Sequence, residues 1–237
     1  LYGHLPMILG ADGDKLSKRH GAVSVMDYPA QGFLPEAMLN YLARLGWSHG
    51  DDEVFSTEQF CEWFNLNHLS KSAAQFNNEK LAWLNNHYIK QADNTRLADL
   101  ARPQMVAAGA VFEGAPDLAQ VLGMMKERAN TVNELAAASM LFFRAPQPEA
   151  ELVTQHITDA IKPVLAQFAE RIATVEWSKE AVAAMIKEVL AANTIKMPLL
   201  AMPLRLILTG QLQTPAIDQV VVIFGRDTVL ARLAKWL

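Results

Sequence analysis

The sequence predicts a mainly α-helical fold that starts with a short β or extended segment. Apolar residues recur at three- and four-residue spacing along most of the 237 residues, and capping residues, glycines and prolines separate these stretches. The chain contains no internal repeat and no low-complexity tract. Its first residues, Leu1–Ile8, are typical of an extended segment and lack the basic stretch that opens a signal peptide. Because the first residue is Leu1 rather than Met, we expect a piece of a longer polypeptide.

Three helices are expected in the first third of the chain. The first begins at Pro35 and ends before Gly46, because proline is favoured in the first helical turn and glycine just past the last. The second begins at Ser56, whose spacing to Gln59 is that of a capping box. A third, short helix is expected over Glu79–Asn85.

The sequence pattern in the middle of the chain predicts further short helices. One covers Thr95–Arg102 and is expected to stop at Pro103, since proline removes a backbone donor. A second runs from Pro116 to Arg128, and Thr131 with Glu134 has the spacing of another capping box.

The clearest linker is the segment 146–148, which reads Pro-Gln-Pro. Beyond it a long apolar stripe contains Pro163, so we expect a kink or a break there. Ser178 is expected to cap the next helix and Asp227 the last one. The chain therefore divides into an N-terminal region at 1–92 and two helical modules at 93–147 and 148–237.

Composition excludes several classes of protein. The chain is 51% hydrophobic and 19% charged, which favours a folded core over disorder, and no apolar run reaches the length of a membrane span. Its single cysteine, Cys61, excludes an internal disulfide and suits the reducing cytoplasm, and we expect it to be buried. A net charge of −4 argues against a uniformly basic surface that coats nucleic acid. Residues 196–237 nevertheless hold five basic and two acidic residues, a local balance of +3.

Aromatic and imidazole side chains suggest no further site. The tryptophans Trp47, Trp63 and Trp83 lie at helical apolar positions, so we expect them in the core rather than as platforms for bases. The six histidines are scattered without metal-ligand spacing, and we expect no metal site. His20, beside a basic loop, is expected to stabilise that loop by a hydrogen bond, and contact with phosphate is the alternative.

The sharpest local feature is the basic loop that spans 12–21. It reads Asp-Gly-Asp-Lys-Leu-Ser-Lys-Arg-His-Gly, with Lys15, Lys18 and Arg19 close together between glycines. Such a loop can place cations around phosphate oxygens while the glycines let the backbone approach closely. A solvated basic turn without a ligand is the alternative, because short charge runs commonly lie on the surface.

The chain resembles the bacterial glutamyl-tRNA synthetases, which are class I aminoacyl-tRNA synthetases. Residues 15–19 resemble the second signature loop of that class, with Leu16 in the position of its methionine. The resemblance extends in order along essentially the whole chain and rests on His4–Pro6, Asp12–Ala22, Gly32–Ala37, Asn40–Trp47, Glu79–Asn85 and Pro203–Gly210. It implies a stem-contact helical segment followed by a two-module α-helical cage that binds the anticodon.

The resemblance also implies a role for the basic loop. In the family this loop closes over Mg-bound ATP, and Lys18 is the lysine that steadies the phosphates, with Lys15 and Arg19 as supporting catalytic charges. The other class signature, of the His-x-Gly-His type, and the glutamate pocket have no counterpart in this sequence. We therefore expect the chain alone to be inactive, and ATP–pyrophosphate exchange above a blank would refute this.

Arg128 is the candidate for reading the anticodon. Residues 126–131 match the stretch where some bacterial members of the family place an arginine against the last anticodon base. A guanidinium can donate two parallel hydrogen bonds to the acceptors of a pyrimidine, and the anticodon ends in C for glutamate and in G for glutamine. The alternative is a cation that complements a helix C-terminus.

A second group of anticodon contacts is implied in the last module by Arg205, Thr214, Pro215 and Ile217. Arg205 interrupts an apolar stripe, so burial requires a partner or water, and an internal salt bridge is the alternative to RNA contact. Ile217 offers an apolar surface against which an unstacked base can lie.

The resemblance therefore implies a cytoplasmic, monomeric glutamate–tRNA ligase fragment whose partner is tRNA(Glu), with ATP and glutamate bound only in the intact enzyme. A helical adaptor that uses the same cage for protein contacts alone is the competing interpretation. A tRNA-modifying relative is disfavoured, because such relatives lack the anticodon cage.

Overall fold

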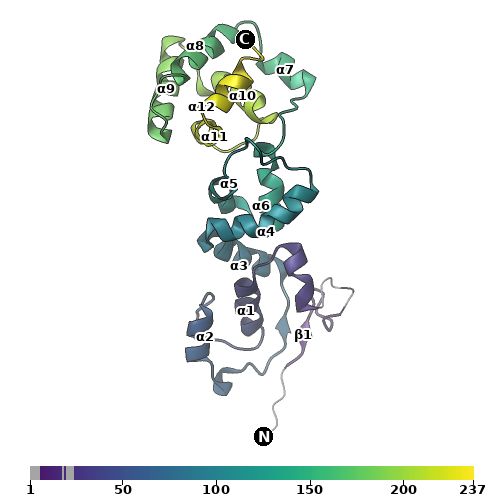
Figure 1. Ribbon diagram of the computed structural model, residues 1–237. Coiled ribbons are helices and arrows are strands. Elements are labelled where there is room, and N and C mark those ends of the chain that lie inside the picture. Colours follow the sequence, from purple (N-terminus) through teal and green to yellow (C-terminus); the bar gives the residue numbers. More distant parts are fainter. Residues whose placement is uncertain (1–5, 18, 20–23) are drawn as a thin grey trace. The chain divides into compact units, whose positions relative to one another are not determined.

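The computed structural model describes residues 6–17, 19 and 24–237, and it confirms the predicted mainly α fold (Figure 1). The chain forms two compact units. Unit 1 comprises 1–101 together with 126–137, and unit 2 comprises 102–125 together with 138–237. Within the described ranges, none of the helices has the length and apolar character needed to cross a bilayer. The predicted three-part division at 92 and 147 stays a prediction.

Unit 1 begins with the predicted extended segment. Strand β1, Ile8–Leu9, pairs in parallel with β2, Ala74–Gln75, so that Ile8 lies opposite Ala74. Two short 3-10 helices follow β1, at Val25–Asp27 (η2) and Pro29–Gln31 (η3). Four helical elements lie between them and the second half of the unit: α1 at Pro35–Arg44, α2 at Thr57–Trp63, η4 at Leu66–His68 and α3 at Asn78–Gln91.

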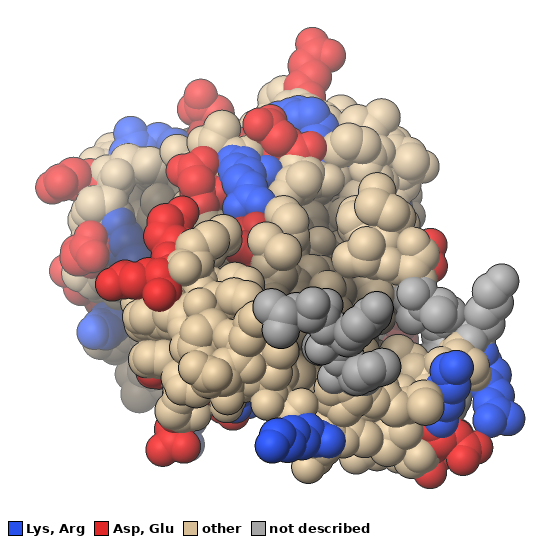
Figure 2. Space-filling view, turned by 90° about the horizontal axis from the view of Figure 1, so that it is seen from below, with Lys and Arg blue, Asp and Glu red and all other residues tan. Residues whose placement is uncertain are grey.

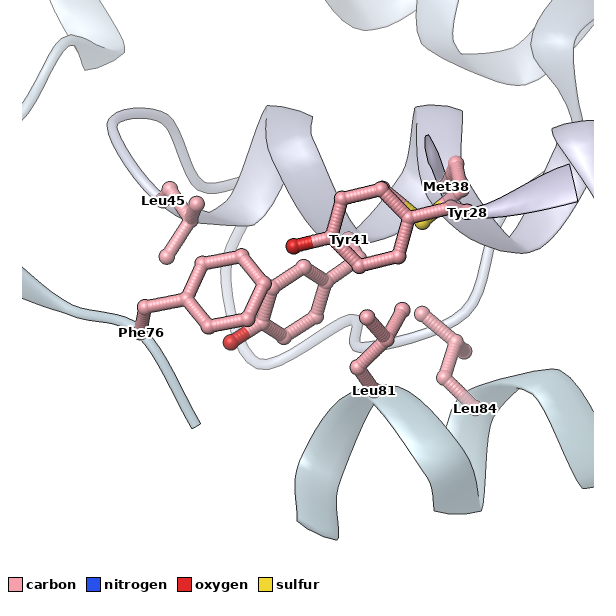
Figure 3. Close-up of a cluster of buried hydrophobic side chains, with 7 residues drawn as sticks. All are labelled: Tyr28, Met38, Tyr41, Leu45, Phe76, Leu81 and Leu84. Carbon is pink, nitrogen blue, oxygen red and sulfur yellow. The ribbon is translucent and has the colours of Figure 1, made fainter. Parts of the chain in front are cut away.

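Helices α1 and α3 lie side by side and enclose the core of unit 1 (Figures 1 and 3). Figure 3 shows aromatic and aliphatic side chains from both helices turned toward one another. The ring of Tyr41 meets Phe76 edge to face at 5.0 Å between centroids, while its hydroxyl donates to Asn77 O at 3.0 Å. The buried members of the cluster are Tyr28, Met38, Tyr41, Leu45, Phe76, Leu81 and Leu84.

The predicted helix starts in unit 1 are confirmed. Pro35 occupies the first turn of α1, and Ser56 and Gln59 form a complete capping box, with Ser56 Oγ accepting from Gln59 N at 3.2 Å and Gln59 Oε1 accepting from Ser56 N at 2.9 Å. Helix α3 continues well past the predicted end at Asn85. It continues because Ile89, like Leu84, is buried, so the apolar face of the helix extends beyond Asn85.

The second part of unit 1 is formed by a segment distant in sequence. After the start of α4 (Asn94–Ala107), the unit resumes with the 3-10 helix η5, Lys126–Arg128, and most of α6, Val132–Ser139. Thr131 Oγ1 accepts from Glu134 N at 3.1 Å, as the capping-box spacing predicts. The returning bond goes to Asn130 N at 2.8 Å, one residue earlier than in the standard motif.

Every regular secondary-structure element among the described residues of unit 2 is a helix. It holds α5 at Leu118–Met125, η6 at Met140–Phe142, α7 at Ala150–His156, α8 at Lys162–Ile172, α9 at Lys179–Ala192, α10 at Met197–Thr209, α11 at Ile217–Phe224 and α12 at Arg226–Leu233. Helix α10 contacts α7, α11 and α12, and its apolar side chains form much of the core. The break at Pro163 is confirmed, because α7 ends at His156 and Pro163 lies in the first turn of α8. The cap at Ser178 is confirmed as well.

Two predictions of helix boundaries are wrong, one of a helix end and one of a helix start. Helix α4 passes through Pro103 instead of stopping before it, because Ala101 and Met105 on either side are buried at 0% and 1% exposure and hold the helical course. Asp227 is not the cap of the last helix. That position belongs to Gly225, whose φ of +79° is a conformation that glycine adopts freely.

Two predictions of burial are also wrong. Cys61 is exposed, because the side chains of this segment that pack against Trp47 are those of Phe60 and Phe64. Trp83 is 47% exposed and Lys80 Nζ lies 4.2 Å above its ring, which is a cation–π contact at the surface. Trp47 is buried, as predicted.

Candidate functional site

The basic loop returns along β1. Leu16 N donates to Ile8 O at 2.9 Å, and Lys15 forms an isolated antiparallel bridge with Leu9. The turn between them is closed by Gly10 N, which donates to Asp14 O at 2.7 Å. Leu16 packs against the core of unit 1. The start of the signature loop is thus anchored by backbone hydrogen bonds and by one apolar side chain.

Two of the three cations of the loop, Lys15 and Arg19, lie among the described residues. Lys15 and Arg19 are exposed, and Arg19 Nη2 donates to Asp14 Oδ2 at 3.0 Å. Both members of this ion pair are about two-thirds exposed, and surface pairs of this kind contribute about 0–1 kcal/mol, so phosphate oxygens can replace the carboxylate. Lys18 and His20 lie outside the described residues.

Polyphosphate fits the donor set of this loop. Lys15 and Arg19 supply cations, and the backbone at Gly13, with a φ of +82°, has no atom within 4 Å of the place where a side chain would start. Divalent cations prefer carboxylate oxygens, and across the described residues no group of three His, Cys, Asp or Glu side chains is placed to hold one.

Arg128, the candidate anticodon reader, is exposed at the last residue of η5. Neither a hydrogen bond nor an ion pair is found for its guanidinium within the described part of the chain. Its neighbours in the chain are held firmly. Ala129 is 4% exposed, and its carbonyl oxygen accepts from Asn86 Nδ2 at 2.7 Å. Free donors on a fixed backbone suit base recognition, and the position at a helix end also fits the alternative of a cation that complements a helix C-terminus.

Arg205 is half-buried in α10 and its guanidinium is held loosely. Nη1 donates to Leu212 O at 3.4 Å, while the buried Nε finds no acceptor among the described residues. The internal salt bridge weighed as an alternative is not observed within the described ranges. Instead, Arg205 interacts with a backbone carbonyl of the loop that follows α10.

The other predicted contacts in unit 2 lie near that same loop. Thr214 Oγ1 donates to Pro215 O at 2.9 Å, and both residues are partly exposed. Ile217 is only 5% exposed at the start of α11, so its side chain belongs to the core and offers little surface to a base.

The basic surplus near the C-terminus has a structural explanation. Arg226 donates to Val175 O and Arg232 to Leu208 O, and burial lowers the pKa of the Arg232 guanidinium. Each arginine also lies over an aromatic ring, Arg226 over Trp177 and Arg232 over Phe224. On the face shown in Figure 2, the basic and acidic side chains of the described residues are scattered among broad uncharged areas. Both guanidinium groups therefore bond within the protein, and the face in Figure 2 shows no continuous basic surface among the described residues.

Sequence reasoning missed the amides that support the Arg128 segment. Asn85 is fully buried in α3 and makes three hydrogen bonds to two other segments of unit 1, the loop before α1 and the residues after η5. The available signal was its position, one residue after Leu84 and four after Leu81, on the apolar face of a helix. An asparagine on such a face needs hydrogen-bond partners from elsewhere in the chain.

Comparisons with known proteins match this architecture. Residues 96–237 match the family described as anticodon binding domain, and residues 1–83 match the catalytic domain of class I tRNA synthetases (E and Q). The chain is 74% identical over 99% of its length to a glutamate–tRNA ligase of Janthinobacterium sp. (strain Marseille), and 71% identical over 100% to one of Herminiimonas arsenicoxydans. It spans about half the length, 50%, of these curated relatives.

A solved structure agrees with these sequence matches. A glutamate tRNA ligase from Elizabethkingia meningosepticum, crystallised in complex with its amino acid, superimposes with a TM-score of 0.82 at 27% identity. The match covers 98% of this chain and 50% of that one. The chain therefore belongs to the bacterial glutamyl-tRNA synthetase family, with class I catalytic-domain sequence followed by an anticodon-binding domain.

Proposed function

We propose that this protein recognises tRNA(Glu) through its anticodon and serves, in the intact enzyme, the ATP-dependent ligation of glutamate to that tRNA. The observation that carries the proposal is Arg128, an exposed guanidinium without a partner among the described residues, directly before a backbone segment held by two amides of α3. Membership of the synthetase family supplies the reaction class. We propose a monomer that acts in the cytoplasm, where translation takes place.

In the proposed reaction a glutamate carboxylate oxygen attacks the α-phosphorus of ATP, and diphosphate leaves. The signature loop stabilises the charge that develops on the phosphates, with Lys18 as the principal cation and Lys15 and Arg19 as supporting ones. The exposure of Lys15 and Arg19, and the weak pairing of Arg19 with Asp14, support this assignment. Magnesium would accompany ATP as a phosphate-bound ion.

In the proposed recognition step Arg128 donates two hydrogen bonds to the last anticodon base. Cytosine presents two acceptors on its pairing edge, whereas guanine presents donors there, so the guanidinium favours C over G. A good bidentate contact contributes about 1–3 kcal/mol of discrimination between bases. Arg205, Thr214 and Pro215 would contact neighbouring nucleotides, and Ile217 would support that loop from within the core.

The test is the variant Arg128→Gln in the 237-residue chain. The dissociation constants for two anticodon-arm RNAs that differ only in the last anticodon base, C or G, are measured by filter binding. We expect the ratio of the dissociation constant for the G-ending RNA to that for the C-ending RNA to fall by about tenfold. The shorter, uncharged glutamine cannot replace the two charged donors of the guanidinium.

The matched control is Arg171→Gln, which removes the same charge from an arginine that already pairs with Glu188. We expect it to leave the ratio unchanged. An unaltered ratio in Arg128→Gln would exclude base reading by this residue, and failure of the wild-type chain to bind either RNA would favour the protein-only adaptor.

A further inference from the structure

Four residues of the segment 126–131 contact α3 or the residue that follows it, and Arg128 is not one of them. Lys126 Nζ donates to Ala92 O at 3.0 Å, just past the end of α3. Glu127 Oε2 lies 3.7 Å from Lys90 Nζ. The contacts on the other side of Arg128 come from two successive amides of α3, those of Asn85 and Asn86.

These two amides hold the backbone directly after Arg128. Asn86 Nδ2 donates to Ala129 O at 2.7 Å, and Asn85 Nδ2 donates to Asn130 O at 2.6 Å. Both bonds lie entirely within unit 1. These bonds fix the orientation of the two peptide planes that follow Ala129 and Asn130, and so restrict the backbone one and two residues past Arg128.

Asn85 also ties this backbone to the loop before α1. Its Oδ1 accepts from Leu34 N at 2.8 Å, and its Nδ2 donates to Gly32 O at 3.3 Å in addition to its bond with Asn130. The side chain is 0% exposed, so every polar atom needs a partner within the protein. An aspartate of the same shape would keep the bond to Leu34 N and lose both donors.

Asn86 differs from Asn85 in a way that makes it the better probe. It is half-buried, and among the described residues its side chain bonds to Ala129 O alone, so its removal leaves the hydrogen bonds of Asn85 intact. A bidentate contact to a base requires the guanidinium to be positioned accurately. Residues that orient such a group can therefore affect specificity without touching the ligand.

We propose that Asn85 and Asn86 are positioning residues for Arg128, so that discrimination between anticodons ending in C and in G depends on two amides that do not contact the RNA. This inference rests on the proposed reading role of Arg128. It predicts that specificity is lost when the segment is released, even though Arg128 itself remains.

The experiment measures the dissociation constants of the 237-residue chain for the two anticodon-arm RNAs, with Asn86→Ala as the principal variant. We expect the ratio of the two constants to fall by about tenfold, close to the effect of Arg128→Gln. We expect the melting temperature to fall by only about 2–4 °C, the cost of one hydrogen bond in a chain of this size.

The control is Asn65→Ala, which removes another half-buried amide of unit 1 that donates to a backbone carbonyl, Trp63 O at 3.2 Å. Its Oδ1 also caps η4 by accepting from Asn67 N at 3.0 Å, so this variant is expected to lower the melting temperature by at least as much and to leave the ratio unchanged. Equal losses of specificity in Asn65→Ala and Asn86→Ala would overturn the proposal, because they would reflect general loosening.

The double variant Asn86→Ala with Arg128→Gln separates positioning from independent effects. If Asn86 acts through Arg128, the double variant has the ratio of Arg128→Gln alone. Additive losses, or an unchanged ratio in Asn86→Ala, would overturn the inference while leaving the proposed function intact. The proposed function fails instead if Arg128→Gln keeps the wild-type ratio, or if the wild-type chain binds neither RNA or binds both equally. Asn85→Asp is a second probe and is expected to reduce the ratio in the same direction.

Discussion

At the scale of single residues, the structure separates side chains that hold the fold from side chains that are free to bind. Arg205, Arg226 and Arg232 all donate to backbone carbonyls, whereas Arg128 has no partner within the described ranges. Charge and sequence position alone do not distinguish these arginines. The distinction comes from what surrounds each guanidinium, and it makes Arg128 the strongest candidate for contact with RNA.

Gly32 lies at the close approach between the loop before α1 and the start of α6. Its φ is +85°, and a Cβ there would lie 2.7 Å from the backbone nitrogen of Asn133. We expect Gly32→Ala to lower the free energy of unfolding by about 3 kcal/mol, from backbone strain and the collision together. Urea unfolding measures this.

Gly50→Ala is the matched comparison for that prediction. Gly50 also has a positive φ, +53°, but nothing lies within 4 Å of its Cβ position. We expect a loss of about 1 kcal/mol there, from backbone strain alone. Equal losses at the two positions would show that the contact with Asn133 contributes nothing.

Some residue-level features were predictable and others were not. Trp47 in the core followed from its helical apolar surroundings, and the same reasoning failed for Trp83 and Cys61. Periodicity shows that a helix has an apolar face, but which residues lie at the edge of that face depends on the packing of neighbouring elements. The three-way hydrogen bonding of Asn85 joins segments far apart in the sequence, so no local pattern reveals it.

At the scale of elements, local signals predicted where helices begin better than where they end. Ser56 and Ser178 cap their helices through bonds to residues three positions on, which sequence spacing alone specifies. Helix ends depend more on tertiary contacts. Pro163 lies in the first turn of α8, where a new helix begins. Helix α4, in contrast, continues through Pro103 because its flanking residues are buried.

Helix α1 is joined to the start of α4 by the pair of Glu36 and Arg96. The guanidinium donates to both carboxylate oxygens, at 2.6 and 3.0 Å. Burial alone would raise the pKa of Glu36, but the hydrogen bonds and charge of Arg96, with a backbone hydrogen bond, hold it below its ordinary value of 4.5. The carboxylate is therefore stabilised more in the folded state than in the unfolded one.

The pair predicts a pH dependence of stability. Because the folded pKa of Glu36 is lowered, its contribution is present above pH 4.5 and is lost as the pH falls through the folded pKa. We expect Glu36→Gln to lower the free energy of unfolding by about 1 kcal/mol at pH 7, since the pair is partly exposed, and by less at pH 3. Thermal unfolding of both proteins across this range measures the difference, and a constant difference would contradict the account.

At the scale of the whole molecule, a net charge of −4 makes specific contacts more important than general attraction to phosphate. The resemblance to glutamyl-tRNA synthetases was visible in the sequence because its motifs recur in order from the basic loop to α10. Family comparison confirms it. Neither the loop position of Lys18 nor the RNA contacts of unit 2 follow from the described residues, so those assignments stay proposals.

The most direct test of the account is the binding of the wild-type chain to the two anticodon-arm RNAs across a range of salt concentrations. We predict tighter binding to the RNA whose anticodon ends in C at every salt concentration, with both affinities falling as salt rises because a few phosphates are neutralised. The ratio of the two affinities should change little with salt, since the base contact releases no counterions. Equal affinities for the two RNAs, or a preference that vanishes as salt rises, would contradict the central claim that this chain reads the glutamate anticodon.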